Sequence, residues 1–212
     1  MVITLSGTLG SGMKEIAARA GEMSGFKICD DETFSKIAID AGYDSEAAAA
    51  KYYDVDAEDF SVKNIEKISS AQKKNRIAFR SIAHDIVPMD IQMEDAMKKV
   101  HSQLADEGGY IIIGRCANYY LRGRRDCVSV FIQGEFEDRL ARVKDYFGVD
   151  DAEALKLIRR NDKRRSDFYA YFTSEKWSDC DNYDFHMNSS RLGMDGSAGL
   201  LCDLIKIAEK GE

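Results

Sequence analysis

Short apolar runs, bounded by glycine or by charged residues, recur along the chain and predict β-strands. The run VITLS ends at a glycine, and the runs YIIIG and VSVFI are rich in apolar and β-branched residues, as buried parallel strands are. Two weaker runs, FKICD and YDFHMNSS, complete the set. The predicted strands are residues 2–6, 26–30, 110–114, 128–132 and 183–190.

Helical patterns separate these runs. Periodic apolar positions or helix-forming composition predict helices over residues 13–23, 45–53, 62–86, 91–106, 135–147, 151–170 and 195–209. The single proline, Pro88, breaks the helical stretch before it, and Gly108 ends the helix that follows. Strands separated by helical segments predict an α/β fold with a doubly wound, five-stranded parallel sheet, and a helical insertion between strands two and three.

Composition and charge narrow the class of protein. A chain of 212 residues, 44% hydrophobic and 32% charged, is long enough for one α/β domain with a sizeable core. The net charge of −7 argues against binding of a nucleic-acid polymer, and no apolar stretch approaches the ~18 residues of a membrane span. Five scattered cysteines and no signal-peptide pattern indicate a cytoplasmic protein, and three dispersed histidines indicate no metal site.

The residues after the first predicted strand form a candidate phosphate-binding loop. The stretch SGTLGSGMKEIA has the spacing G-x-x-x-x-G and lies between a strand and a helix, as a phosphate loop does. Backbone N–H groups there, together with the helix N-terminus, would bind an anion. We predict that the nucleotide phosphates contact Gly7, Gly10, Ser11, Gly12, Met13 and Lys14.

The loop departs from the usual pattern at its lysine. A standard loop continues with lysine, which binds phosphate, and then with serine or threonine, which binds Mg²⁺. Here Met13 and Lys14 occupy those two positions. Because successive helix residues are rotated by about 100°, Lys14 should point toward the usual place of the metal. We predict that Lys14 is the phosphate-binding lysine and that binding depends little on Mg²⁺; the alternative is a solvated first-turn lysine.

A second candidate is the basic stretch LIRRNDKRRSDFYAYF at residues 157–172, with five positive charges in the seven residues 159–165. Arg160 and Arg164 are four apart and share a helix face, and Asp162 can hold a neighbouring guanidinium. Guanidinium groups bind phosphate oxygens in pairs. We therefore predict that Arg160 and Arg164 stabilise a transferred phosphoryl group; the alternative is a solvated helix face.

Other polar residues follow the remaining predicted strands, at the edge where parallel sheets bind ligands. Asp30 follows the second strand, Arg115 the third and the stretch GEFEDR (134–139) the fourth. An arginine at the end of a buried strand needs an anionic partner, so we predict that Arg115 binds an acceptor or a phosphate. Asp30 also leaves open a dinucleotide-binding oxidoreductase, although the spacing G-x-x-G-x-G fits that loop poorly.

The aromatic stretch at 167–177 has three interpretations. Its rings could stack on a base, form a partner surface or pack the basic helix on its own core. We predict a role in a homodimer contact or in docking of that helix. The residues concerned are Phe168, Tyr169, Tyr171, Phe172 and Trp177.

Together these motifs resemble the cytidylate kinase-like branch of the P-loop nucleoside monophosphate kinases. The resemblance runs through ITLSGTLGSGMKEIA, ICDDETFSKIA, IIIGRCANYYL, VSVFIQGEFEDRLARV, IRRNDKRR and NYDFHMNSSRLGMDG, and covers nearly all of the chain except about 45–90. It implies one P-loop kinase domain over 1–212, with a helical insertion at about 40–105 and an arginine-rich lid at about 151–178. The chain departs from the family at Met13 and at Cys116, where an aspartate would follow Gly114 and Arg115.

The resemblance implies an ATP-dependent kinase that phosphorylates CMP or another small acceptor. The donor is ATP, and Lys14, Arg160 and Arg164 would neutralise the transferred group. Asp30, Arg115 and Asp162 would bind the substrate. The alternative is a catalytically weak, nucleotide-binding regulatory protein, which the missing P-loop lysine favours.

Overall fold

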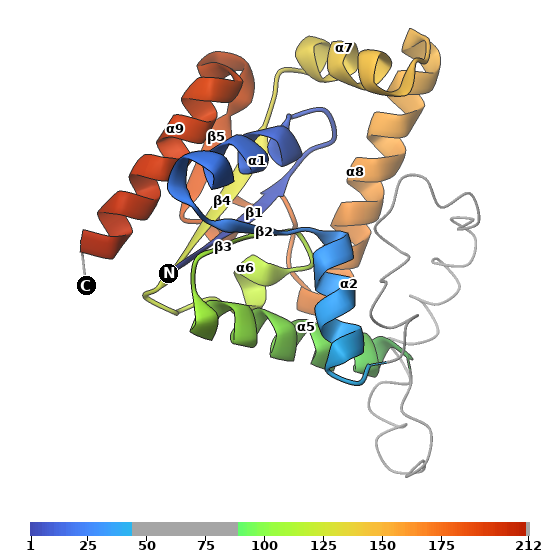
Figure 1. Cartoon of the computed structure of the whole chain (residues 1–212). Coiled ribbons are helices and arrows are strands. Elements are labelled where there is room, and N and C mark those ends of the chain that lie inside the picture. Colours follow the sequence, from blue (N-terminus) through green and yellow to red (C-terminus); the bar gives the residue numbers. More distant parts are fainter. Residues whose placement is uncertain (44–88, 211–212) are drawn as a thin grey trace.

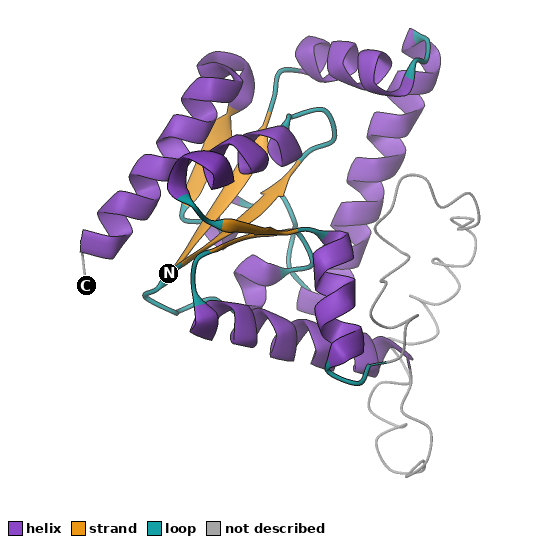
Figure 2. Cartoon of the chain, viewed as in Figure 1, coloured by secondary structure: helices purple, strands orange, loops and turns teal. Residues whose placement is uncertain are grey.

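The computed structural model describes residues 1–43 and 89–210 (Figure 1). Within these residues a sheet of five strands has the order β2-β3-β1-β4-β5 (Figure 2). Each neighbouring pair is parallel, so the predicted α/β fold with its five-stranded parallel sheet is confirmed. The strands are β1 (Val2–Gly7), β2 (Lys27–Cys29), β3 (Tyr110–Ile113), β4 (Cys127–Gln133) and β5 (Phe185–Asn188).

Helices lie on both faces of this sheet. They are α1 (Met13–Ser24), α2 (Asp31–Asp40), α5 (Met89–Glu107), α6 (Ala117–Tyr120), α7 (Phe136–Phe147), α8 (Asp151–Thr173) and α9 (Ser189–Lys210), with a 3₁₀ turn at Cys180–Asn182. The start of α9 is interrupted at Gly193, whose φ of 69° and ψ of 174° are not helical. The sequence did not predict α2 or α6, and the helices predicted at 45–53 and 62–86 lie outside the described residues.

Alternating residues of the strands supply two separate cores, because successive side chains of a strand point to opposite faces. Ile3 and Leu5 of β1 belong to the apolar cluster under α1 and α9. Val2 and Phe131 belong to the cluster on the other face, with α2, α5, α6 and the C-terminal part of α8. Figure 1 shows α1 and α9 on one side of the sheet and α5 and α6 on the other. Since both faces are covered, the central strands are apolar along most of their length.

The α7–α8 hairpin carries a third, smaller apolar cluster beside the sheet. Its buried residues are Val143, Ala154, Leu157 and Ile158. Leu9, from the loop after β1, packs against the same cluster. The hairpin therefore contacts the candidate phosphate loop through side chains, as well as through the polar contacts described below.

The aromatic stretch at 167–177, at the end of α8 and just after it, packs mainly on the chain's own core. Four of its five rings are buried: Phe168, Tyr169, Phe172 and Trp177. The Trp177 ring meets the ring of Phe131 edge-on, with centroids 5.2 Å apart, and Tyr171 is partly buried against the same cluster. This burial supports the docking role; a homodimer stays a prediction. Across the described residues, none of the helices has the length and apolar character that crossing a bilayer requires.

Candidate functional site

The polar segments predicted from the sequence meet at one edge of the sheet. Because all strands are parallel, their carboxyl ends lie on the same side, where ligands of such sheets bind. This edge holds the loop 8–12 after β1, the start of α2 after β2 and the turn 114–116 after β3. The first turns of α7 follow β4 there. Figure 1 shows the loop after β1 extending toward α8.

The loop after β1 has the backbone geometry of an anion site. Gly10 and Gly12 have φ angles of 80° and 77°, in the left-handed region that favours glycine. The amide N–H groups of Gly10, Gly12, Met13 and Lys14 have no hydrogen-bond acceptor among the described residues. Bare amides at the N-terminus of a helix of 12 residues attract a negative group, because the helix dipole adds to their partial charges.

Packing also requires glycine in this loop. A Cβ atom on Gly7 would lie 2.4 Å from the carbonyl oxygen of Ile132 in β4. A Cβ atom on Gly10 would lie 2.6 Å from the carbonyl oxygen of Arg139 in α7. Both distances are shorter than real contacts of such atoms. The glycines therefore let β4 lie directly against the end of β1 and let α7 lie directly against the loop. The phosphate contact predicted for Gly7 stays a prediction.

Both backbone polar groups of Leu9, its N–H and its carbonyl, are bound by the α7–α8 hairpin. Asp162 of α8 accepts a hydrogen bond from the Leu9 amide at 2.8 Å. Arg139 of α7 donates to the Leu9 carbonyl oxygen at 2.8 Å, and its guanidinium also pairs with the Asp162 carboxylate. The guanidinium that Asp162 was predicted to hold therefore includes that of Arg139, which belongs to the other helix of the hairpin.

Two further arginines bind backbone carbonyl groups, one in the loop and one at the end of β1. Arg142 of α7 donates to the Gly10 carbonyl oxygen at 3.0 Å, and buried Arg165 of α8 donates to that of Gly7. Sequence analysis did not single out Arg139, Arg142 or Arg165 as site residues. The sequence shows a polar stretch at 134–139 and a run of positive charge at 159–165. Neither pattern indicates a contact with backbone carbonyls.

Serines complete the support of the loop. The Ser189 hydroxyl, at the start of α9, donates to the Ser11 carbonyl oxygen at 2.7 Å. The Ser11 amide donates to the Thr8 carbonyl oxygen at 3.1 Å. The hydroxyl of Ser11 is buried and has no partner within the described residues. Ser11 therefore shapes the turn through its backbone, and its amide is already engaged.

Met13 and Lys14 face different surroundings. The Met13 side chain is 6% exposed and packs in the cluster under α1 and α9, so this position is part of the core. Lys14 is exposed. The charge of Lys14 acts on the Asp30 carboxyl. Burial alone would raise the pKa of Asp30, but hydrogen bonds from Thr33 and the positive charge of Lys14 outweigh burial, so the pKa is lowered. Lys14, in the first turn of α1, therefore lies near the end of β2.

Asp30 caps α2. Its carboxylate accepts a hydrogen bond from the Thr33 amide at 2.9 Å, in an extended conformation typical of an N-cap. The sequence analysis predicted a substrate contact for Asp30, which stays a prediction beside this structural contact.

The turn after β3 is strained. Gly114, Arg115 and Cys116 have φ angles of 74°, 52° and 57°, so three consecutive residues are left-handed and two of them carry side chains. Each such non-glycine residue costs on the order of 1–2 kcal/mol. Strain of this kind concentrates at functional sites, where surrounding contacts hold it in place.

The Arg115 side chain is 1% exposed and is bound within the chain. Its Nε donates to the Asp31 carboxylate at 2.9 Å, and its guanidinium lies over the Phe34 ring, 4.3 Å from the centroid. The anionic partner that an arginine needs at this position is therefore present at the start of α2. A contact of Arg115 with an acceptor stays a prediction.

Buried His101 of α5 supports the same turn. Its Nε2 lies 3.0 Å from the carbonyl oxygen of Arg115, and since a carbonyl only accepts, Nε2 carries the proton. Burial lowers the pKa of His101 to about 4. The ring is therefore neutral near pH 7.

Arg160 and Arg164 share one flank of α8, as their spacing predicts. Asp162 is rotated by about 200° from Arg160 and lies on the other flank, against the loop. Burial and the charge of Arg160 lower the pKa of Arg164. Helix α8 thus has the two arginines on one side of its buried face and the Asp162 carboxylate on the other.

The residue after Met13 differs from the usual Mg²⁺-binding residue of a phosphate loop. Lys14 stands where a hydroxyl ligand would be, and its charge repels a cation. Among the described residues, the one group of metal-binding side chains close together is Asp179, Cys180 and Asp181, in the turn before β5. The weak dependence on Mg²⁺ predicted from the sequence stays a prediction.

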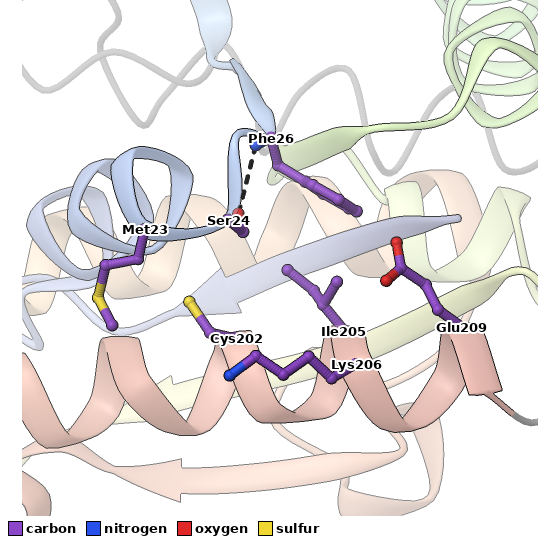
Figure 3. A pocket seen from close by; sticks show the side chains of 7 residues that line it. All are labelled: Met23, Ser24, Phe26, Cys202, Ile205, Lys206 and Glu209. Carbon is purple, nitrogen blue, oxygen red and sulfur yellow. Dashed lines mark hydrogen bonds between the residues drawn. The ribbon is translucent and has the colours of Figure 1, made fainter.

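A separate pocket of about 220 Å³ lies between the C-terminal halves of α1 and α9 (Figure 3). The phosphate loop precedes the other end of α1, so this pocket is not part of the candidate site. Its lining residues are Met23, Ser24, Phe26, Cys202, Ile205, Lys206 and Glu209.

Comparisons with known proteins agree with this geometry. The model of the cytidylate kinase-like family matches residues 2–191. A cytidylate kinase from Methanopyrus kandleri is 24% identical over 210 residues, which cover 95% of this chain and 91% of that protein.

Two solved structures have a similar fold. An uncharacterized protein from Eubacterium ventriosum aligns with a TM-score of 0.67 at 18% identity, over 97% of this chain and 98% of that one. A shikimate kinase from Bacteroides thetaiotaomicron aligns with a TM-score of 0.50 at 12% identity, over the same shares. The predicted P-loop kinase fold is confirmed.

We predict that stability falls as pH is lowered from 7 to 4, in part through His101. The unfolded chain binds a proton on this residue near pH 6.5, whereas the buried ring does so only near pH 4. Between these values the unfolded state binds more protons, so the free energy of unfolding rises with pH. The full contribution is about 3 kcal/mol.

Chemical denaturation at pH 7, 5.5 and 4 measures this effect. In His101→Gln, whose amide can still donate to the Arg115 carbonyl, this part of the pH dependence should be absent. The same pH dependence in both proteins would show that the ring is not buried in its neutral form.

Proposed function

Since the chain belongs to the cytidylate kinase-like family, we propose that it transfers the terminal phosphoryl group of ATP to CMP or another small acceptor. The observation that carries the proposal is the row of bare amides at Gly10, Gly12, Met13 and Lys14, at the start of α1. Such a row binds the phosphates of a nucleotide. The family match supports a nucleotide kinase over the dinucleotide-binding alternative.

The proposed roles follow from charge and position. The bare amides bind the donor phosphates, and exposed Lys14 adds a cation at their edge. Arg160 and Arg164 stabilise the charge on the transferred group from the lid helix. Positioning and neutralisation of charge supply most of the catalysis in such a transfer, so a general base is not essential.

A second candidate is a nucleotide-binding regulatory protein with little turnover. Met13 favours it, because the residue at the usual lysine position is packed in the core. A screen of ATP and Mg²⁺ against all nucleoside monophosphates separates the two. Phosphorylation of CMP above the other acceptors supports the first proposal; ATP binding without turnover on any acceptor supports the second.

Lys14 should account for much of the nucleotide affinity. We expect Lys14→Ala to raise the Kd for ATP by about tenfold or more, or about 1.4 kcal/mol, because it removes a cation at the anion site. In the native protein, replacing Mg²⁺ with a chelator should change the Kd by less than about threefold on the same scale. Isothermal titration calorimetry measures both.

Lys98→Ala, which removes an exposed lysine of α5, is the matched control and should bind ATP as the native protein does. A large Mg²⁺ requirement, or an unaltered affinity in Lys14→Ala, would show that Lys14 is a solvated surface residue.

Arg115 should affect both stability and acceptor binding. Arg115→Ala leaves the Asp31 carboxylate without this partner. We expect the free energy of unfolding to fall by about 2 kcal/mol. This loss is smaller than for a fully buried ion pair, because Asp31 is partly exposed. Acceptor binding should weaken by about 1.5–3 kcal/mol, as for a charged hydrogen bond. Calorimetry and thermal unfolding separate the two effects: a lower melting temperature with unchanged acceptor affinity makes Arg115 a structural ion pair only.

A further inference from the structure

The backbone of Leu9 in the phosphate loop and the side chains of Arg139 and Asp162 form a closed ring of contacts. The Leu9 amide donates to Asp162, the Leu9 carbonyl accepts from Arg139, and Arg139 and Asp162 pair with each other. The side chains of Arg139 and Asp162 are 13% and 24% exposed. Because water reaches these groups only in part, the contacts are stronger than a surface ion pair.

Packing acts on the same residue. The Leu9 side chain lies against the apolar cluster of the α7–α8 hairpin, so both its backbone and its side chain are held by these two helices. The backbone of α7 also lies so close to Gly10 that a side chain there would collide with Arg139. The conformation of the loop immediately before its bare amides is therefore set by the hairpin.

We propose that Asp162 is a positioning residue that fixes the phosphate loop for the nucleotide. It acts through Leu9 and Arg139, and the acceptor contact of Asp162 predicted from the sequence stays a prediction. The proposal rests on the proposed function, because the bound ligand is taken to be ATP. With Asp162 in place, the amides that follow Leu9 are held in one orientation before the nucleotide arrives, and less ordering is needed on binding.

The same contact joins the two halves of the site. Arg160 and Arg164 lie on the helix that carries Asp162, so the contact of Asp162 with Leu9 also sets the distance from these arginines to the loop. Nucleotide affinity and the docking of α8 are then coupled, and each must strengthen the other.

Two measurements test the proposal. The first is hydrogen exchange of the Leu9 amide without nucleotide: it should be slow in the native protein and faster in Asp162→Ala. The second is the Kd for ATP, which should rise at least tenfold in Asp162→Ala and in Arg139→Ala. The double variant should bind about as weakly as the weaker single variant, because both residues act through one ring. Asp162→Asn, which keeps an acceptor but loses the charge, should lie between.

Asp167→Ala is the matched control, because it removes a carboxylate of the same helix that pairs with Lys163 on the exposed side. It should match the native protein in both measurements. Equal Leu9 exchange in Asp162→Ala and Asp167→Ala would overturn the ring. If the Leu9 amide exchanges faster in Asp162→Ala but this variant binds ATP as tightly as the native protein or more tightly, the positioning role is overturned. Tighter binding would show that the Asp162 carboxylate competes with phosphate. If the native protein binds no ATP, the proposed function fails and this role with it, whereas the exchange measurement still reports on the ring.

Discussion

The phosphate loop depends on one residue, Leu9, whose backbone N–H and carbonyl groups are both bound by one helical hairpin. The Asp162 carboxylate accepts a hydrogen bond from the Leu9 amide, and Arg139 donates one to the Leu9 carbonyl oxygen. The Leu9 side chain packs against the apolar cluster of the two helices. Gly10 has no side chain, which allows α7 to approach this closely. The bare amides at the start of α1 follow directly in the chain. The anion site therefore owes its shape to contacts with residues 130 and 153 positions away.

Positive charge around this loop is distributed in an unusual way. The standard lysine position holds Met13, which is part of the core, and the first exposed cation of α1 is Lys14 beside Asp30. Three guanidinium groups of the hairpin bind backbone carbonyls at the loop, and Arg160 and Arg164 lie on the other flank of α8 from Asp162. The chain belongs to the cytidylate kinase-like family, and this membership supports the proposed binding of a nucleotide by these amides.

Much of the fold is encoded locally and could be predicted. The central strands β1, β3 and β4 are continuous apolar runs, and the edge strands β2 and β5, which are more exposed, were found from weaker runs. The loop was recognised from its glycines. The sequence pattern was insufficient where one residue type has two interpretations. Asp30 was interpreted as a polar loop residue, but it caps α2, a helix that the sequence did not predict. Partners could not be predicted when they are distant in sequence. An anion for Arg115 was expected on physical grounds, yet nothing local identifies Asp31, 84 residues away.

The central claim, that bare amides of a preformed loop bind the nucleotide, is tested most directly by amide resonances during a titration with ATP. The account predicts large shifts for Gly10, Gly12, Met13 and Lys14, with smaller changes at Leu9, whose amide is already bonded to Asp162. Shifts confined to another region, such as the pocket between α1 and α9, with the loop amides unchanged, would contradict it.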